Sequence, residues 1–186
     1  MGVVEVLPRL HMFRFRIGQA YLWRDGADLA LIDAGDIDAA PAIEGAVRGP
    51  GLDPARIGRI VIAHGHCDHY GAAQELADRH GAEILAHGPD AAVIRGEEAV
   101  APRVPHRDPS SRHGVLFTGD TVARVDRMIP GVLNIDRAQT VASFRRPAAL
   151  EPATVCFGHG EPLTADSAAL MRASADRYAR LQIEHG

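Results

Sequence analysis

The sequence predicts a mixed α/β fold in which residues 1–186 form one domain. Near the N-terminus, short apolar runs are separated by turn signals, which is typical of antiparallel strands. A β-branched run, a stretch with helical spacing and a second apolar run then follow one another, as in a β-α-β unit. The hydrophobic content of 46% and the charged content of 24% are ordinary for a globular protein with a sizeable core.

The N-terminal runs are predicted to form an antiparallel meander of four strands. Asp25-Gly26 is a strong signal for a tight hairpin turn, and Asp33-Ala34-Gly35 closes the meander. The predicted strands are residues 3–6, 10–15, 20–23 and 29–32.

The middle of the chain alternates helices and strands. Asp38 is expected to cap the first helix, and Ile43, Ala46 and Val47 are expected to face inward. Gly49-Pro50-Gly51 breaks this helix, and Gly81 ends the second. The predicted order is helix 38–48, strand 59–63, helix 71–80, strand 83–87 and helix 90–98.

The last third contains shorter strands and a long helix. Residues 100–113 are rich in Pro, Arg and Ser, and no strand is predicted there. The C-terminal helix is expected to be capped by Thr164 or Asp166 and to carry a core-facing stripe of Leu170, Met171, Ala175, Tyr178 and Leu181. Before it we expect strand 115–117, a helix over 136–149 interrupted by Pro147, and strand 153–157.

Three imidazoles and one carboxylate lie within six residues of the sequence, at His64, His66, Asp68 and His69. They follow the β-branched strand 59–63 and precede a helix, so they are predicted to lie on a strand-to-helix loop that aims them into one cleft. Neutral imidazole and carboxylate are ligands of zinc, iron and manganese. The pattern therefore predicts a metal site, and the alternative is a polar loop with surface histidines.

Further candidates lie at the ends of other strands. Asp120 and His159 each follow a short apolar strand and a glycine, so each can present its side chain at the same sheet edge as the histidine motif. Asp33 can orient a ligand imidazole from outside the ligand shell, or it can be a turn-forming Asp before Gly. Cys67 can ligate a metal or be an incidental small residue, and His87 is interpreted as a strand-end histidine.

Charge and composition exclude several classes of partner. The net charge is −4 and the arginines are scattered among acids, which argues against a nucleic-acid partner. No leader pattern and no apolar run of membrane-spanning length is present, so we expect a cytoplasmic protein with no membrane partner. Two cysteines, Cys67 and Cys156, are too few for a disulfide framework. No sequence feature indicates the oligomeric state.

The segment from His64 to His69 resembles the HxHxDH signature of the metallo-β-lactamase-fold hydrolases. The resemblance extends to residues 31–35 upstream, to residues 116–121 downstream and to residues 157–163 near the end, so it covers most of the chain. It implies an αββα sandwich in which the six candidate ligands, His64, His66, Asp68, His69, Asp120 and His159, cluster at one sheet edge.

The resemblance also implies how two metal ions would share these ligands. His64 and His66 would serve the first metal, together with a third histidine, and Asp120 would bridge the two metals. Asp68, His69 and His159 would serve the second. The expected metal is zinc, as one or two ions, with iron or manganese as alternatives.

The sequence departs from the family pattern between residues 100 and 113. The third histidine of the family lies in a segment resembling HTPGHT, which is absent here together with about two strands. His106 and His113 are possible substitutes, but neither ends a visible strand, and solvent-facing histidines in an irregular loop are the favoured reading. The first metal thus lacks one ligand, and we expect nearer one zinc than two per chain.

By this resemblance the chain is expected to be a zinc-dependent hydrolase of a small ester, thioester or lactone, with β-lactams less favoured. A metal-activated hydroxide would be the nucleophile, and Asp68 would orient it and carry its proton to the leaving group. A metal-binding but catalytically silent member of the fold is the alternative, motivated by the missing segment. A redox di-iron site is a third reading, although no flavin module is visible.

Overall fold

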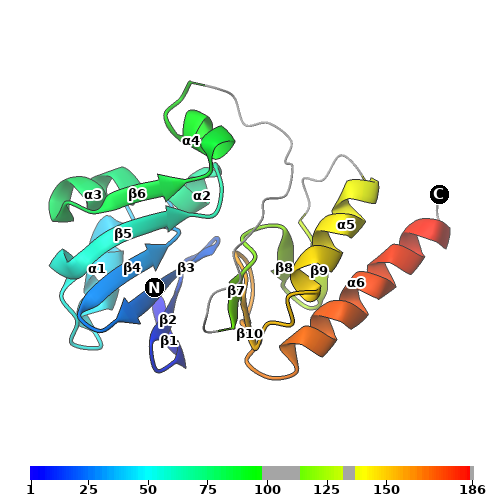
Figure 1. Cartoon of the computed structure of the whole chain (residues 1–186). Helices are drawn as coiled ribbons and strands as arrows, with labels where there is room; N and C mark the ends of the chain where they lie inside the picture. The colour runs from blue at the N-terminus through cyan, green and yellow to red at the C-terminus, as the bar shows by residue number, and fades with distance from the viewer. Residues whose placement is uncertain (98–113, 132–136, 185–186) are drawn as a thin grey trace. The chain divides into compact units, whose positions relative to one another are not determined.

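The computed structural model describes residues 1–97, 114–131 and 137–184, and the chain forms two compact units, Met1–Val100 and Ala101–Gly186. Figure 1 shows the elements of both units. Two compact units are compatible with one domain or with two, so the single domain over residues 1–186 stays a prediction.

The first unit is built on a six-stranded sheet with the strand order β1-β2-β3-β4-β5-β6 (Figure 1). Strands β1 to β4 pair antiparallel, which confirms the meander. Strands β4, β5 and β6 pair parallel. The strands are Gly2–Leu7, Leu10–Arg14, Gln19–Asp25, Asp28–Ile32, Ile57–Ile62 and Glu83–Ala86.

The predicted turn at Asp25-Gly26 closes the β3–β4 hairpin. Asp25 pairs with Asp28 across a two-residue loop, and Gly26 has a φ of +61°. A residue without a Cβ adopts this left-handed conformation at little cost, so glycine here fixes the register of the two strands.

The helices of the first unit differ from the prediction mainly at their ends. They are α1 (Ala40–Arg48), the short 3-10 helix η1 (Pro54–Arg56), α2 (Cys67–Tyr70), α3 (Ala73–His80) and α4 (Gly88–Ile94). Asp38 does not cap α1: its φ is +67°, and the helix starts two residues later, with Pro41 in its first turn, where a missing N–H costs nothing. The predicted helix 71–80 begins at Ala73, and a separate turn of helix, α2, forms within the histidine motif.

The core of the first unit lies between its sheet and its helices. The buried Ile43 and Val47 of α1 and Leu76 of α3 belong to one cluster with sheet residues such as Phe13 and Leu31. Burial of each such side chain stabilises the fold by about 1.5–3 kcal/mol. Ala46 is also buried, so all three residues predicted to face inward from α1 do so.

A buried acid connects α1 to α3. The Glu44 carboxylate accepts hydrogen bonds from Arg79 at 3.2 Å and from Arg48 at 3.3 Å, and it lies 3.0 Å from Nε2 of His80. Burial alone would raise the pKa of Glu44, but the hydrogen bonds from Arg79, His80 and Arg48 outweigh burial and hold that pKa below its usual value. The ionised carboxylate therefore helps to hold α1 against α3.

The second unit has two small sheets and two helices. Strands β7 (Val115–Phe117) and β10 (Thr154–Cys156) pair parallel, with Cys156 opposite Phe117. Strands β8 (Val122–Arg124) and β9 (Met128–Pro130) form an antiparallel hairpin, which was not predicted because Arg124 and Pro130 interrupt its short apolar runs. Helices α5 (Arg137–Ala148) and α6 (Ser167–Glu184) complete the unit.

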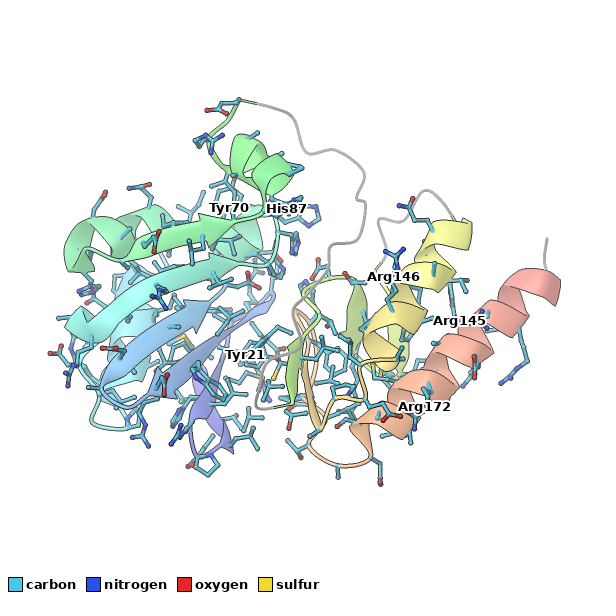
Figure 2. The ribbon with its side chains drawn as sticks, in the orientation of Figure 1. Tyr21, Tyr70, His87, Arg145, Arg146 and Arg172 are labelled. Atoms are coloured by element: carbon cyan, nitrogen blue, oxygen red, sulfur yellow. The ribbon has the colours of Figure 1, made fainter. Side chains whose placement is uncertain are left out.

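A separate core holds the second unit together. It includes Leu116 and Val155 from the parallel strands, Phe144 from α5 and Met171 from α6. An ion pair also links the helices, because Arg145 of α5 donates to Asp176 of α6 at 3.4 Å. Figure 2 labels Arg145. Exposed pairs of this kind contribute at most about 1 kcal/mol, so the apolar core supplies most of the stabilisation.

Two expectations for these helices are corrected. Pro147 does not interrupt α5 but lies in its last turn, and the helix ends one residue later. In the C-terminal helix, Met171 and Ala175 are buried as predicted, but Leu170 and Leu181 are each 43% exposed. These two leucines lie at the borders of the stripe, where a helix of 3.6 residues per turn rotates them toward solvent.

The segment in which the chain departs from its family pattern, residues 100–113, lies outside the described residues. His106 and His113 belong to it, as does the place of the two missing strands. Glu98, the last residue of the predicted helix 90–98, also lies outside the described residues. Among the described residues, no helix has the length and apolar character needed to cross a bilayer. The cytoplasmic location stays a prediction.

Candidate metal site

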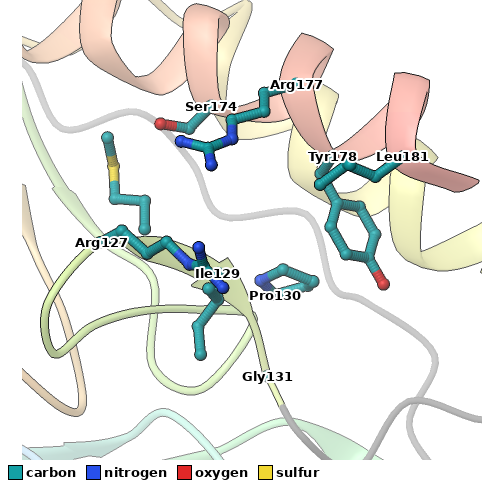
Figure 3. Close-up of a pocket in the computed structure, with 9 residues that line it drawn as sticks. Arg127, Ile129, Pro130, Gly131, Ser174, Arg177, Tyr178 and Leu181 are labelled. Carbon is teal, nitrogen blue, oxygen red and sulfur yellow. The ribbon is translucent and has the colours of Figure 1, made fainter.

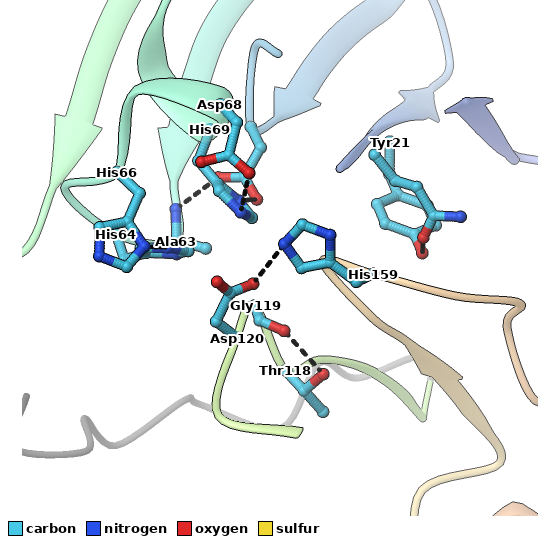
Figure 4. A network of polar contacts seen from close by, with 12 residues as sticks. Tyr21, Ala63, His64, His66, Asp68, His69, Thr118, Gly119, Asp120 and His159 are labelled. Carbon is cyan, nitrogen blue, oxygen red and sulfur yellow. Dashed lines mark hydrogen bonds and ion pairs between the residues drawn. The ribbon is translucent and has the colours of Figure 1, made fainter. Parts of the chain in front are cut away.

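The first half of the candidate site is the segment that follows β5. His64 is fully buried, and His66 is the residue that precedes α2. Nε2 of His64 lies 2.9 Å from Nδ1 of His66, and the rings of His64 and His69 are 3.9 Å apart between centroids (Figure 4). The structure thus brings the three predicted imidazoles together instead of spreading them over the surface.

The single turn of α2 places Asp68 and His69 side by side. Oδ2 of Asp68 lies 3.6 Å from Nε2 of His69. The N–H of Ala34 donates to the carbonyl of His69, and the N–H of Gly71 donates to the carbonyl of Gly35 at 2.8 Å. A Cβ at Gly71 would lie 2.3 Å from the backbone nitrogen of Ile37. Glycine is therefore required for the end of α2 to approach the segment that follows β4 this closely.

Asp33 has the turn conformation that its sequence context allows, and its carboxylate also contacts an imidazole; that this imidazole is a metal ligand stays a prediction. It has a φ of +60°, as a turn residue does, and its side chain is buried. Oδ2 lies 2.8 Å from Nδ1 of His69, and Oδ1 accepts a hydrogen bond from the N–H of Ala63 at 2.7 Å. An ionised carboxylate at Nδ1 holds the proton on that nitrogen, which directs the lone pair to Nε2. His69 is thereby prepared to bind a cation through Nε2.

The second half of the candidate site belongs to the second unit. Asp120 follows β7, and His159 follows β10. Because these strands are parallel neighbours, their carboxyl ends meet at one edge of the small sheet. Nε2 of His159 lies 3.3 Å from Oδ1 of Asp120 (Figure 4). Within this unit the two side chains thus lie close together at one sheet edge, and the expectation that the histidine motif shares this edge stays a prediction.

Backbone hydrogen bonds extend beyond these two strands and fix the loops that carry Asp120 and His159. The N–H of Thr118 donates to the carbonyl of Cys156, and the N–H of Gly158 donates to the carbonyl of Gly119. The N–H of Arg124 donates to the carbonyl of His159 at 2.9 Å. The next residue, Gly160, has a φ of +106°, and a Cβ there would lie 1.6 Å from the carbonyl oxygen of Arg124.

The donor sets of both halves fit a metal ion. Imidazole nitrogen and carboxylate oxygen are the groups that bind zinc at about 2.0–2.2 Å, and two ligands of a tetrahedral ion are then about 3.3 Å apart. Asp120 and His159 have that separation. Whether the four ligands of the first unit and the two of the second meet at one ion stays a prediction.

The two cysteines differ in exposure. Cys67 is exposed beside His66 and Asp68, and its role as a ligand stays open. Cys156 is buried, and burial raises the pKa of its thiol far above the usual value, so it stays protonated. Cys156 is therefore a core residue of β10.

Sequence reasoning missed one contact of the histidine segment. The N–H of Gly65, between His64 and His66, donates to Oδ1 of Asp90 at 2.9 Å. Asp90 was interpreted only as the start of a helix, since nothing in the local pattern distinguishes an acid that binds a distant backbone from one that caps its own helix.

A pocket of about 340 Å³ lies elsewhere in the second unit, between β9 and α6 (Figure 3). None of the six predicted ligands lines it. Its walls come from the segment around Met128 to Gly131 and from one side of α6.

Comparisons with known proteins agree with this reading of the motif. The family model described as the metallo-beta-lactamase superfamily matches residues 13–111. A hydroxyacylglutathione hydrolase from Anaeromyxobacter dehalogenans (strain 2CP-C) is 38% identical over 120 residues, which cover 55% of this chain and 45% of the relative. The chain thus spans less than half the length of this curated relative.

Solved structures share the fold over nearly the whole chain. A metallo-beta-lactamase from Pontibacter korlensis has a TM-score of 0.70 at 11% identity, covering 96% of this chain and 98% of its own. A metallo-beta-lactamase family protein from Thermus thermophilus has a TM-score of 0.65 at 20% identity, covering 96% of this chain and 82% of its own. At these identities the likeness concerns the fold alone.

Proposed function

The chain belongs to the metallo-beta-lactamase superfamily, and on that premise we propose that it is a metal-dependent hydrolase of a small thioester, ester or lactone. Its mixed α/β fold of the metallo-beta-lactamase type agrees with the prediction. The observation that carries the proposal is the buried contact of 2.8 Å between Asp33 and Nδ1 of His69. A surface histidine needs no buried carboxylate at Nδ1, whereas a metal-binding histidine is commonly oriented in this way.

The ligands are assigned by the family resemblance. We infer that His64 and His66 would hold one zinc ion and that Asp68, His69 and His159 would hold a second, with Asp120 as a further ligand. Iron or manganese would accept the same donors. When bound, such an ion lowers the pKa of a water molecule and polarises a carbonyl oxygen.

Asp68 is proposed to move the proton. Its carboxylate is partly exposed, with a side chain 19% accessible, and lies beside His69. It can accept the proton of the attacking water and return it to the leaving group. The water oxygen forms the new bond to the acyl carbon, the bond from that carbon to sulfur or oxygen breaks, and the leaving thiol or alcohol departs with the proton.

Among the substrate classes, we favour a thioester. The curated relative is named for hydrolysis of a hydroxyacylglutathione, in which an acyl group is carried by the thiol of a small peptide. The net charge of −4 and the scattered arginines fit a small substrate better than a nucleic acid.

Turnover by metal-loaded protein tests the proposal. Zinc-loaded protein is assayed with a hydroxyacyl thioester of glutathione, a nitrophenyl ester and a simple lactone, with and without a chelator. We expect thioester hydrolysis that the chelator abolishes, and a loss of about 10²–10⁴-fold in Asp68→Asn. His80→Ala, which removes an imidazole that contacts Glu44 instead, is the matched control and keeps activity.

The second candidate function is a metal-binding but catalytically silent protein. Two observations favour it. The chain lacks the segment that carries the third histidine, and the family match ends at residue 111, before Asp120 and His159. Protein with verified zinc content that hydrolyses none of the three substrates would establish this alternative. Visible absorption bands in protein as purified would instead support the di-iron reading.

A further inference from the structure

Helix α4 contacts the backbone between two proposed metal ligands. Gly65 is buried between His64 and His66, and its N–H donates to Oδ1 of Asp90 in the first turn of α4. A Cβ at Gly65 would lie 3.1 Å from Cγ1 of Val93, one turn further along α4. The turn between the two histidines is therefore held on one side by a carboxylate and an aliphatic side chain.

This contact constrains the directions of both imidazoles. The peptide group that contains the Gly65 N–H joins His64 to Gly65, and its orientation sets how the chain leaves one histidine and approaches the next. A hydrogen bond from a backbone N–H to an ionised carboxylate is stronger than one between neutral groups. It can therefore hold this peptide group in place before any metal binds.

We propose that Asp90 is a positioning residue of the metal site, which orders the turn from His64 to His66 so that both imidazoles can bind the same ion. The proposal rests on the proposed function in one respect, because it takes His64 and His66 as ligands. Residues that orient ligands in this way typically change metal affinity by about ten- to a hundredfold when they are lost.

Cobalt absorption spectra test this role without measuring turnover. Co²⁺ is titrated into metal-free wild-type protein, Asp90→Ala, Asp90→Asn and the control Asp53→Ala. Asp53 also accepts a backbone hydrogen bond, from Ala55 at 3.0 Å, but it lies at η1. Asp90→Ala should bind Co²⁺ at least tenfold more weakly with an altered visible spectrum, Asp90→Asn should recover part of the affinity through its remaining oxygen, and Asp53→Ala should match the wild type.

The outcomes separate this inference from the function on which it rests. Wild-type affinity and spectrum in Asp90→Ala would overturn the positioning role and leave the metal site intact. Equal weakening in Asp53→Ala would also overturn it, because a general loss of stability would then explain both variants. Failure of the wild type to bind Co²⁺ would overturn both the proposed function and this inference.

The pocket between β9 and α6 carries an independent inference. Arg127 and Arg177 both line it, and in the part of the chain that the structure describes neither makes an ion pair or hydrogen bond. Figure 3 shows their guanidinium groups extending toward the same space, with the Ser174 hydroxyl nearby. Two like charges repel each other there, and an anion between them would replace that repulsion by attraction.

The other walls of the pocket are largely apolar. Ile129, Pro130 and the ring of Tyr178 line it, and the volume of about 340 Å³ falls in the range of small-molecule sites. Guanidinium groups bind phosphate and carboxylate oxygens through paired N–H groups. We propose that this pocket binds a small dianion with an apolar group, of the phosphate monoester class.

Binding of phenyl phosphate, followed by amide chemical shifts, tests the second proposal. We expect saturable shifts around Ile129 and Tyr178, and at least tenfold weaker binding in Arg127→Gln and in Arg177→Gln. Arg180→Gln on the same helix, which does not line the pocket, should bind as the wild type does. Unchanged affinity in both pocket variants, or equal weakening in Arg180→Gln, would overturn the proposal.

Discussion

At the scale of single residues, Asp33 determines which nitrogen of His69 can bind a metal. In Asp33→Asn, the amide oxygen would accept from the Ala63 N–H, and the amide N–H would then donate to Nδ1 of His69. The imidazole proton would move to Nε2, the nitrogen needed for the metal. We expect metal affinity about ten- to a hundredfold lower, measured by competition with a chromophoric chelator.

The control for this prediction is Asp53→Asn, which changes another carboxylate that accepts a backbone hydrogen bond. It should leave metal affinity unchanged. Wild-type affinity in Asp33→Asn would show that His69 is not a ligand through Nε2.

Gly160 illustrates how a ligand loop depends on one residue without a Cβ. Gly160→Ala adds left-handed strain of about 1–2 kcal/mol and an overlap with the carbonyl of Arg124 that costs about 1–3 kcal/mol more. The free energy of unfolding, measured by urea denaturation, should fall by the sum of the two costs. Gly26→Ala, where φ is +61° and nothing lies within 4 Å, should show only the first. Equal losses in the two variants would mean that the loop carrying His159 relaxes freely.

At the scale of elements, the contact of α1 with α3 should be sensitive to acid. The pKa of Glu44 is lowered in the folded protein, so its contribution is fully present above the unfolded value, about 4.3, and is lost as pH falls through the folded pKa. Glu44→Gln should lose about 1–3 kcal/mol at pH 7. It should also reduce the acid dependence of stability below about pH 4.3.

Denaturation at several pH values measures this effect. Glu75→Gln removes an acid of α3 that also binds Arg79 but is more exposed, and it should change stability by less than about 1 kcal/mol. A Glu44→Gln curve parallel to that of the wild type from pH 3 to 7 would contradict the prediction.

Elements with strong local signals were predicted well. The Asp25-Gly26 hairpin, the inward face of α1 and the strand at 115–117 follow from turn chemistry and periodicity, which act over a few residues. The β8–β9 hairpin could not be predicted, because its short strands include Arg124 and Pro130 and so lack the continuous apolar run that marks 115–117. The start of α1 was wrong because Asp38 fits a cap by residue type, while its backbone is left-handed.

At the scale of the whole molecule, the metal content should reveal the missing ligand. By the family assignment, one ion keeps Asp68, His69, His159 and Asp120, while the other has only His64, His66 and Asp120. We expect nearer one zinc than two per chain after dialysis, with His159→Ala losing more metal than His64→Ala. Elemental analysis measures both, and His80→Ala is the control.

Two tightly held ions would contradict this account and would mean that another residue, such as His106 or His113, completes the first site. The sequence could single out six candidate ligands, because four lie in one local and specific motif and two follow short apolar strands; their role as ligands stays a prediction. It could not predict the partners that orient them: the contact between Asp33 and His69 was one of two open readings, and the contact between Asp90 and Gly65 was missed. Those contacts join residues 36 and 25 positions apart in the sequence, and only the tertiary fold brings them together.

The unequal exposure of the two thiols gives the protein an internal chemical reporter. Cys67 is exposed between two proposed ligands, whereas Cys156 is buried within β10 with a raised pKa. An alkylating reagent should therefore label one cysteine in the native protein and two after unfolding, as mass spectrometry can count. Zinc should slow labelling of Cys67 by ordering the segment around it. Equal rates with and without zinc would mean that occupancy leaves this segment unchanged.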